Sequence, residues 1–278
     1  MIFSKLLFSI LLFSGFNFVG KKIINKLNIK YFFSKIINLY LINIAIGIVA
    51  VILILYPFLL YKIIYLIHLK ILLILLIIIG GLNIIFSFNK DTLIKYYNSN
   101  KNLKFNLDKI FLFILVFLFF LFSLLPITDA DSTGYHLFIP KFYLENEYFP
   151  IQTFNYHTYL FGIGEIFNLF FLALDLDLFI TLTNFLGIII ILSLIINFNL
   201  KYPENSFYSL LILSCPIIIP LINTAKPQFF YISLIGILFA IIINLKKNIF
   251  KTKSLYQILF IICIFGITCY LAKITFAI

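Results

Sequence analysis

Long apolar stretches alternate with short polar segments along most of this chain. Apolar stretches of roughly 17 to 25 residues match the thickness of bilayer hydrocarbon when they are helical. They predict membrane-spanning helices at residues 2–19, 37–60, 69–87, 110–125, 178–197, 206–223, 228–245 and 255–278. The chain lacks the alternating apolar and polar positions of barrel strands. We therefore expect an all-α fold, a polytopic transmembrane helical bundle of about eight helices.

A further apolar run, residues 158–174, is weaker as a lipid-facing span because it contains Glu165 and the glycines Gly162 and Gly164. Two arrangements follow. If the run crosses the membrane fully, the later lysines between residues 246 and 253 fall outside; if it crosses only halfway, they fall inside. Since lysines favour the cytoplasmic side, we prefer a half-crossing or interfacial helix here.

Composition and charge support this membrane interpretation. The chain is 63% hydrophobic and only 11% charged, which is far from a soluble globular domain. Its net charge of +11 comes from 21 lysines without any arginine, and the lysines gather in the segments 20–35 and 90–109. Such clusters are typical of cytoplasmic loops, so we expect no nucleic acid as a partner. We expect a multi-pass integral protein of a bacterial inner (plasma) membrane.

Two local patterns could mislead. The first run resembles a signal peptide, but no small-residue cleavage site follows it, so we interpret it as the first membrane helix. The three cysteines, Cys215, Cys263 and Cys269, lie in apolar runs without metal-site spacing. We expect them to be small buried hydrophobic residues.

The segment 126–150 is the one place where the chain becomes acidic. Seven of the ten acidic residues in the chain lie between 129 and 177, where Lys141 is the only lysine. The segment follows the fourth predicted span, which starts from a lysine-rich loop, so we place it on the outer face. The whole loop, residues 126 to about 157, is long for a link between helices, as functional loops often are, and we expect a short interfacial helix at 136–146.

Asp129 and Asp131 are the first candidates for chemistry in this outer loop. Two carboxylates at this spacing can share a divalent cation such as Mg²⁺ or Mn²⁺. Alternatively, one of them can act as a general base. The competing interpretation is a solvated turn after a helix, with no catalytic role.

Tyr135, His136 and Lys141 follow in the same loop. The histidine can carry a proton near neutral pH, and the lysine can bind a phosphate. The alternative is an amphipathic interfacial helix in which Lys141 pairs with Glu145. His68 and His157 stand apart from this loop, and we assign both to packing at the membrane interface.

Glu165, Lys226 and Lys273 are ionisable groups at or inside membrane depth. Such groups are costly in hydrocarbon and are usually kept for function. For the lysines, the alternative is that the stem lies in the membrane while the amine reaches the interface.

The pattern P-x-T-D-x-D-S-x-x-Y-H-L-x-x-P-K-x-Y-L-E-N at 126–146 resembles the first outer loop of GT-C-type polytopic glycosyltransferases. Bacterial proteins similar to dolichyl-phosphate-mannose transferases are the nearest group. The segments ILSCPIIIPLINTAKPQFFYISLIGILFA and GITCYLAKITFAI resemble later helices of that family. The resemblance covers residues 108–278, a GT-C-like core apparently truncated at its C-terminus, and residues 1–107 resemble the additional N-terminal helices of some members.

The resemblance implies transfer of a hexose from a polyprenyl-phosphate sugar donor to a lipid, glycan or protein acceptor at the outer membrane face. Asp131 matches the position of the catalytic acid, with Asp129 second, and both are expected metal ligands. The expected substrate-binding residues are Tyr135, His136, Lys141, Glu165, Lys226 and Lys273.

Two hypotheses from other classes compete with this cell-envelope enzyme. In a secondary transporter, Glu165 and the aspartates would carry protons or substrate, although no inverted repeat is visible. In an inactive, truncated membrane protein, the acidic residues would only solvate a loop.

Overall fold

The computed structural model describes residues 2–34, 36–61, 65–87, 107–146, 162–198, 205–247 and 252–272. All regular secondary structure within these ranges is helical, which confirms the expected all-α fold. Six of these helices are long and apolar enough to cross a membrane. They are α1 (Ile2–Lys26), α3 (Leu39–Leu60), α4 (Leu66–Ser87), α9 (Asp177–Phe198), α12 (Gln228–Lys247) and α13 (Thr252–Ala272). The protein is therefore a multi-pass membrane protein.

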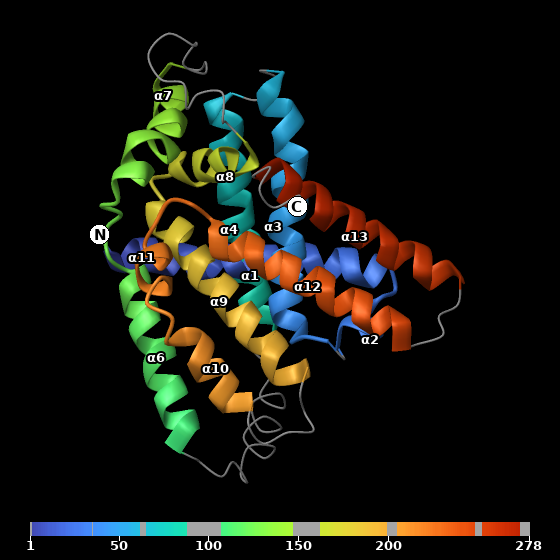
Figure 1. Ribbon diagram of the computed structural model, residues 1–278. Coiled ribbons are helices and arrows are strands. Elements are labelled where there is room, and N and C mark those ends of the chain that lie inside the picture. The colour runs from blue at the N-terminus through green and yellow to red at the C-terminus, as the bar shows by residue number, and fades with distance from the viewer. Residues whose placement is uncertain are drawn as a thin grey trace.

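The fourth predicted span corresponds to α6 (Leu107–Ser123), a helix of 17 residues. The run predicted at 206–223 is not one continuous helix. It is divided into α10 (Asn205–Leu213) and α11 (Ile218–Ile222), both of which pack against α6 (Figure 1). Pro216 lies in the break, and a proline removes a backbone donor and disfavours helix in the residue before it.

The weak run at 158–174 contains α8 (Ile163–Leu172), whose ten residues are all buried. A helix of this length spans about 15 Å, roughly half of the hydrocarbon thickness. The preferred half-crossing arrangement agrees with this length, whereas a full crossing by α8 alone does not.

Aromatic side chains anchor α8 in the centre of the molecule. The ring of Phe171 lies 4.2 Å from that of Phe179 on α9 and 6.1 Å from that of Phe16 on α1. Phe167 stacks on Phe230 of α12 with ring centroids 6.4 Å apart. Because fully buried aromatic rings from three other elements hold α8, polar groups on this helix have fixed positions.

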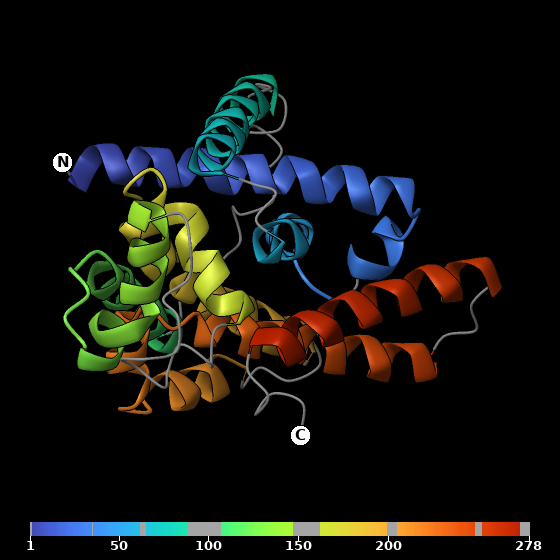
Figure 2. The ribbon, with the colours of Figure 1, turned by 90° about the horizontal axis from the view of Figure 1, so that it is seen from above.

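Helix α1 crosses α3 and α4 at a steep angle, as two perpendicular views show (Figures 1 and 2). The crossing depends on glycine. A Cβ atom added at Gly20 would lie 1.8 Å from the backbone oxygen of Asn43 on α3, and one at Gly80 of α4 would lie 1.8 Å from the oxygen of Leu11. Without a side chain at these positions, the helix backbones come into direct contact.

The cysteine prediction is correct only for Cys269, which is buried on α13. Cys215 and Cys263 are exposed on the protein surface. An apolar run in the sequence does not distinguish a helix face that packs in the protein core from one that faces lipid, because both surroundings are apolar. The sequence therefore could not show that these two cysteines are exposed.

Candidate functional site

The acidic stretch folds into three short pieces after α6. A connection leads to Asp129, a single π-helical segment η1 spans Ser132–His136, and α7 spans Phe138–Asn146. The expected interfacial helix at 136–146 thus has its counterpart in α7. Within the described residues, no ion pair joins Lys141 to Glu145, so the packing of α7 does not depend on that pair.

Asp129 fixes the start of the helical segment that contains η1. Its Oδ1 accepts a hydrogen bond from the backbone N–H of Asp131 at 3.2 Å, and its Oδ2 accepts one from the N–H of Ser132 at 3.0 Å. The Ser132 hydroxyl also donates to Oδ2. A carboxylate that accepts from the first free N–H groups of a helix acts as an N-cap. These contacts give Asp129 a structural role and set the position of Asp131.

The turn at residues 223–227, which we call the Lys226 turn, packs directly against this segment. The backbone N–H of Ala225 donates to the Ser132 hydroxyl at 2.9 Å. Asn168 of α8 donates through Nδ2 to the carbonyl of Ala225 at 2.8 Å and to that of His136 at 3.0 Å. One buried asparagine therefore connects the outer loop to the turn.

A second buried asparagine fixes the turn from the side of α9. Asn184 Nδ2 donates to the carbonyls of Thr224 at 3.2 Å and Lys226 at 2.9 Å, and Asn223 Nδ2 donates to the carbonyl of Pro126 at 3.0 Å. Buried peptide groups need such partners, because an unpaired one costs as much as a lost hydrogen bond. The Lys226 turn is held by side chains of η1, α8 and α9.

The result is an ion pair between residues 95 positions apart. Lys226 Nζ lies 2.7 Å from Asp131 Oδ2, with 18% of the lysine side chain and 67% of the aspartate side chain exposed. The cation is mostly covered while its carboxylate partner faces outward. A ligand approaching from outside therefore meets Asp131 first and Lys226 beneath it.

A second pair, between His136 and Glu165, lies deeper. His136 Nδ1 is 2.7 Å from Glu165 Oε1, and the two side chains are 12% and 6% exposed. The other carboxylate oxygen accepts from the N–H of Gly162 at 2.8 Å, so Glu165 caps the first turn of α8. A carboxylate is favoured there by the helix dipole, and both of its oxygens have partners.

Six of the sequence-predicted residues therefore lie in one connected region: Asp129, Asp131, Tyr135, His136, Glu165 and Lys226. The ring of Tyr135 joins this region by packing against the ring of His136 in a tilted arrangement, with the two centroids 3.8 Å apart. Lys141 is exposed on α7, and no hydrogen bond or ion pair among the described residues connects it to the region. Lys273 and His157 lie outside the described residues.

Sequence reasoning missed the residues that assemble this region, namely Ser132, Asn168 and Asn184. All three are buried. A signal existed for the asparagines, because each interrupts an apolar run, and amides in such runs need buried partners.

The predicted divalent cation is not favoured by these contacts. Both carboxylate oxygens of Asp129 accept from N–H or O–H donors, and Asp131 pairs with Lys226. Among the residues that the structure describes, no group of three or more His, Cys, Asp or Glu side chains is arranged to hold a metal ion. The two aspartates thus do not offer a ready pair of metal ligands.

Replacing Asn168 by alanine is expected to destabilise the region. The change removes both hydrogen bonds to the carbonyls of His136 and Ala225, and should lower the free energy of unfolding by about 2 kcal/mol. Thermal unfolding of the purified protein in detergent measures the loss. The matched control is Asn197→Ala on α9, since among the described residues the side chain of Asn197 donates only to Ser193 Oγ, at 3.4 Å. Equal stability of the two variants would contradict the bridging role of Asn168.

Comparison with known proteins identifies a family for this chain. No curated protein matches the chain. No solved structure matches it either. Residues 92–278, which include the whole region described above, match the model of the DUF1420 N-terminal domain. Since this match covers more than half of the chain, the protein belongs to the DUF1420 family.

Proposed function

We propose that this protein is a GT-C-type membrane glycosyltransferase that transfers a hexose from a polyprenyl-phosphate donor to an acceptor at the outer membrane face. The observation that carries the proposal is the contact between Asp131 and Lys226. It combines an outward-facing carboxylate with a covered cation, on a turn that three helical segments hold. A glycosyl transfer to a hydroxyl needs these two groups, a base and a cation for the leaving phosphate.

The proposed reaction is a direct displacement at the anomeric carbon. Asp131 takes the proton of the acceptor hydroxyl. At the same time the hydroxyl oxygen of the acceptor forms the new bond to the anomeric carbon of the sugar. The bond between the anomeric carbon and the phosphate oxygen breaks, and its electron pair leaves with the polyprenyl phosphate. Lys226 stabilises the charge on that phosphate as a point charge. Donor binding would also draw Lys226 away from Asp131 and free the carboxylate for the acceptor.

The remaining residues support these two in the proposal. Asp129 positions Asp131 through its backbone N–H. Tyr135 offers an aromatic ring beside His136, and Glu165 orients His136. Lys141 and Lys273 are proposed only as further cations for the donor. The setting is the cell envelope, with the protein in a bacterial plasma membrane. No step requires a metal ion.

The test is transfer of radiolabelled sugar from polyprenyl-phosphate donors in membranes that contain the full-length protein. Asp131→Asn should lower the transfer rate about 100-fold or more, as expected for loss of a general base. The control is Asp175→Asn, because Asp175 is exposed in the turn between α8 and α9 and has a positive φ of 54° that asparagine tolerates.

An Asp131→Asn variant that inserts normally and keeps its transfer rate would exclude Asp131 as the base. If the wild type transfers no sugar from any donor, a secondary transporter becomes the better proposal. The buried pair between His136 of η1 and Glu165 of the half-length helix α8 favours that second candidate. Proton-coupled uptake into proteoliposomes, abolished in Glu165→Gln, would then be expected.

A further inference from the structure

A polar cavity of about 490 Å³ lies between α1, α2 (Lys30–Ser34), α3 and α4, away from the region described above. Its lining comes from the second half of α1, the first residue of α2, the start of α3 and the last turn of α4. Every lining residue precedes residue 92, so the cavity lies outside the segment that matches the DUF1420 model. The inference drawn from it is independent of the proposed function.

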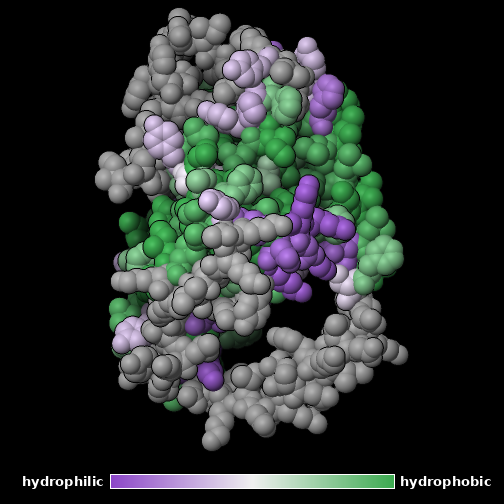
Figure 3. Space-filling view, turned by 90° about the vertical axis from the view of Figure 1, so that its right-hand side faces the viewer, coloured by the Kyte–Doolittle hydropathy of each residue, from purple (hydrophilic) through white to green (hydrophobic). Residues whose placement is uncertain are grey.

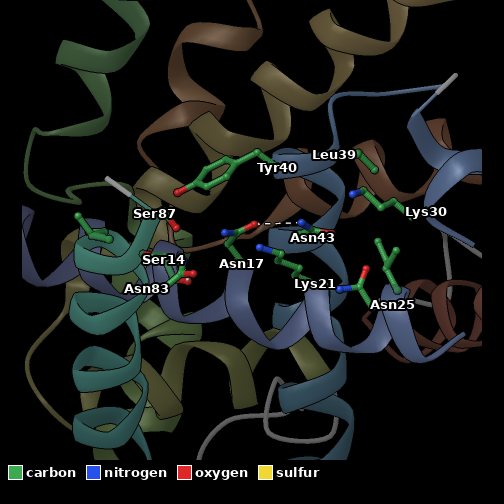
Figure 4. Close-up of a pocket in the computed structure, with 12 residues that line it drawn as sticks. Ser14, Asn17, Lys21, Asn25, Lys30, Leu39, Tyr40, Asn43, Asn83 and Ser87 are labelled. Carbon is green, nitrogen blue, oxygen red and sulfur yellow. Dashed lines mark hydrogen bonds between the residues drawn. The ribbon is translucent and has the colours of Figure 1, made fainter. Parts of the chain in front are cut away.

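The described lining of the cavity carries positive charge without a negative partner. Lys21 and Lys30 line it, and no lining residue is acidic. No ion pair involving either lysine occurs among the described residues. Figure 4 shows both side chains extending toward the hydrogen bond between Asn43 Nδ2 and Asn17 Oδ1, which measures 3.1 Å. Two cations close together in a partly enclosed site repel each other unless an anion binds between them.

Neutral hydrogen-bond donors accompany the lysines. The Asn17–Asn43 bond uses the Oδ1 atom of Asn17, which leaves its Nδ2 to donate, and the Asn25 amide and Tyr40 hydroxyl also line the cavity. A phosphate ester offers several strong acceptor oxygens and negative charge, and therefore matches this set of donors. A metal cation does not match it, because carboxylates are missing from the lining.

The walls of the cavity are preorganised. Asn17 and Asn43 are only 7% and 8% exposed, and the close approach of α1 to α3 at Gly20 fixes their helices. Asn83 of α4 donates to the Ser14 hydroxyl at 2.9 Å, which ties the third wall to α1. Fixed donors lose little conformational entropy when a ligand binds.

The position of the cavity indicates where such a ligand comes from. Lys5, near the start of α1, pairs with Asp177 at the start of α9, whereas the cavity lies along the second half of α1. Figure 3 shows a hydrophilic patch within a hydrophobic face on this side, where Lys21, Lys22, Asn25 and Lys26 are exposed. The lysine-rich segment predicts a cytoplasmic location, at the level of the phosphate groups of anionic lipids.

We propose that the cavity between α1, α2, α3 and α4 binds a phosphate ester, with Lys21 and Lys30 as its two cations. Both a lipid headgroup and a soluble phosphate ester have this chemistry. The volume exceeds that of a phosphate ion, which leaves room for the alcohol part of the ester.

Three probes, tested with the purified full-length protein in detergent by native mass spectrometry and by thermal shift, distinguish the sources. Phosphatidic acid and diacylglycerol differ only in the phosphate, whereas phosphatidic acid and glycerol 3-phosphate differ only in the acyl chains. Saturable binding of phosphatidic acid alone supports a lipid headgroup, and comparable binding of glycerol 3-phosphate supports a soluble ester. Binding of neither phosphate compound, or equal binding of diacylglycerol, would overturn the proposal.

The lysine assignment is tested by two double variants with the same loss of charge. Lys21→Gln/Lys30→Gln should weaken phosphate-ester binding by about tenfold or more, because a charge-assisted hydrogen bond is lost at each position. Lys22→Gln/Lys26→Gln, outside the lining, should change it by less than about twofold. Equal losses would indicate a diffuse basic surface and contradict the site. Lys21→Arg/Lys30→Arg should retain binding, because both positive charges remain. If a glutamine variant fails to fold, the comparison of phosphatidic acid with diacylglycerol on the wild-type protein still decides whether binding requires the phosphate.

Discussion

Gly20→Ala is expected to lower the free energy of unfolding by about 3 kcal/mol, at the upper end of what overpacking costs. The added Cβ would lie 1.8 Å from the backbone oxygen of Asn43. A backbone oxygen cannot rotate away as a side chain can, so α1 and α3 must separate along their contact. The separation would also widen the cavity that Asn17 and Asn43 line. The affinity for a phosphate ester should therefore fall together with the stability.

Thermal unfolding in detergent, followed by circular dichroism, measures this change. The matched control is Gly266→Ala on α13, where an added Cβ meets no atom within 4 Å. Since alanine favours helix more than glycine by up to about 1 kcal/mol, the control should be neutral or slightly stabilising. If both variants changed stability in the same direction, the close crossing of α1 and α3 would be disproved.

Glu165→Leu is expected to lower the free energy of unfolding by about 3 to 5 kcal/mol, as when one partner of a buried pair is removed. The substitution leaves His136 without its carboxylate, whose Oε1 lies 2.7 Å from the ring nitrogen. It also removes the acceptor for the Gly162 N–H at the start of α8. Because α8 positions Asn168, the Lys226 turn should loosen at the same time.

Denaturant or thermal unfolding of Glu165→Leu, His136→Leu and the double variant completes this test. The double variant should be more stable than the sum of the single losses implies, by about 1 to 3 kcal/mol, because the two residues are in contact. Glu145→Leu on the exposed face of α7 is the control and should cost less than about 0.5 kcal/mol. Additive losses in the double variant would show that the pair does not form.

Local patterns in the sequence predicted much of the helical fold. The apolar runs located the long helices, and the outer-loop pattern located α7. Glu165 and the glycines beside it indicated that α8 would not cross as an ordinary span, because a lipid-facing helix does not retain a carboxylate without reason. The division of 206–223 was overlooked, although Pro216 is visible in the sequence and acts on its immediate neighbours.

The relations between distant segments required the tertiary structure. Asp129 and Asp131 look equivalent in sequence, yet one caps a helix while the other pairs with Lys226. The amides that hold the Lys226 turn act on backbone carbonyls, which every residue carries and no sequence pattern distinguishes.

The sequence by itself determined which segments are helical and apolar and which end of the bundle carries acidic or basic residues. These properties depend on neighbours within a few helical turns. The tertiary structure alone decided that α1 crosses α3 and α4 steeply, that Asp131 meets Lys226, and that Lys21 and Lys30 line one cavity. Apolar faces can pack in many orientations at similar free energy, and the choice among them depends on close contacts, such as that of Gly20 with Asn43, that exist only once the helices are in place.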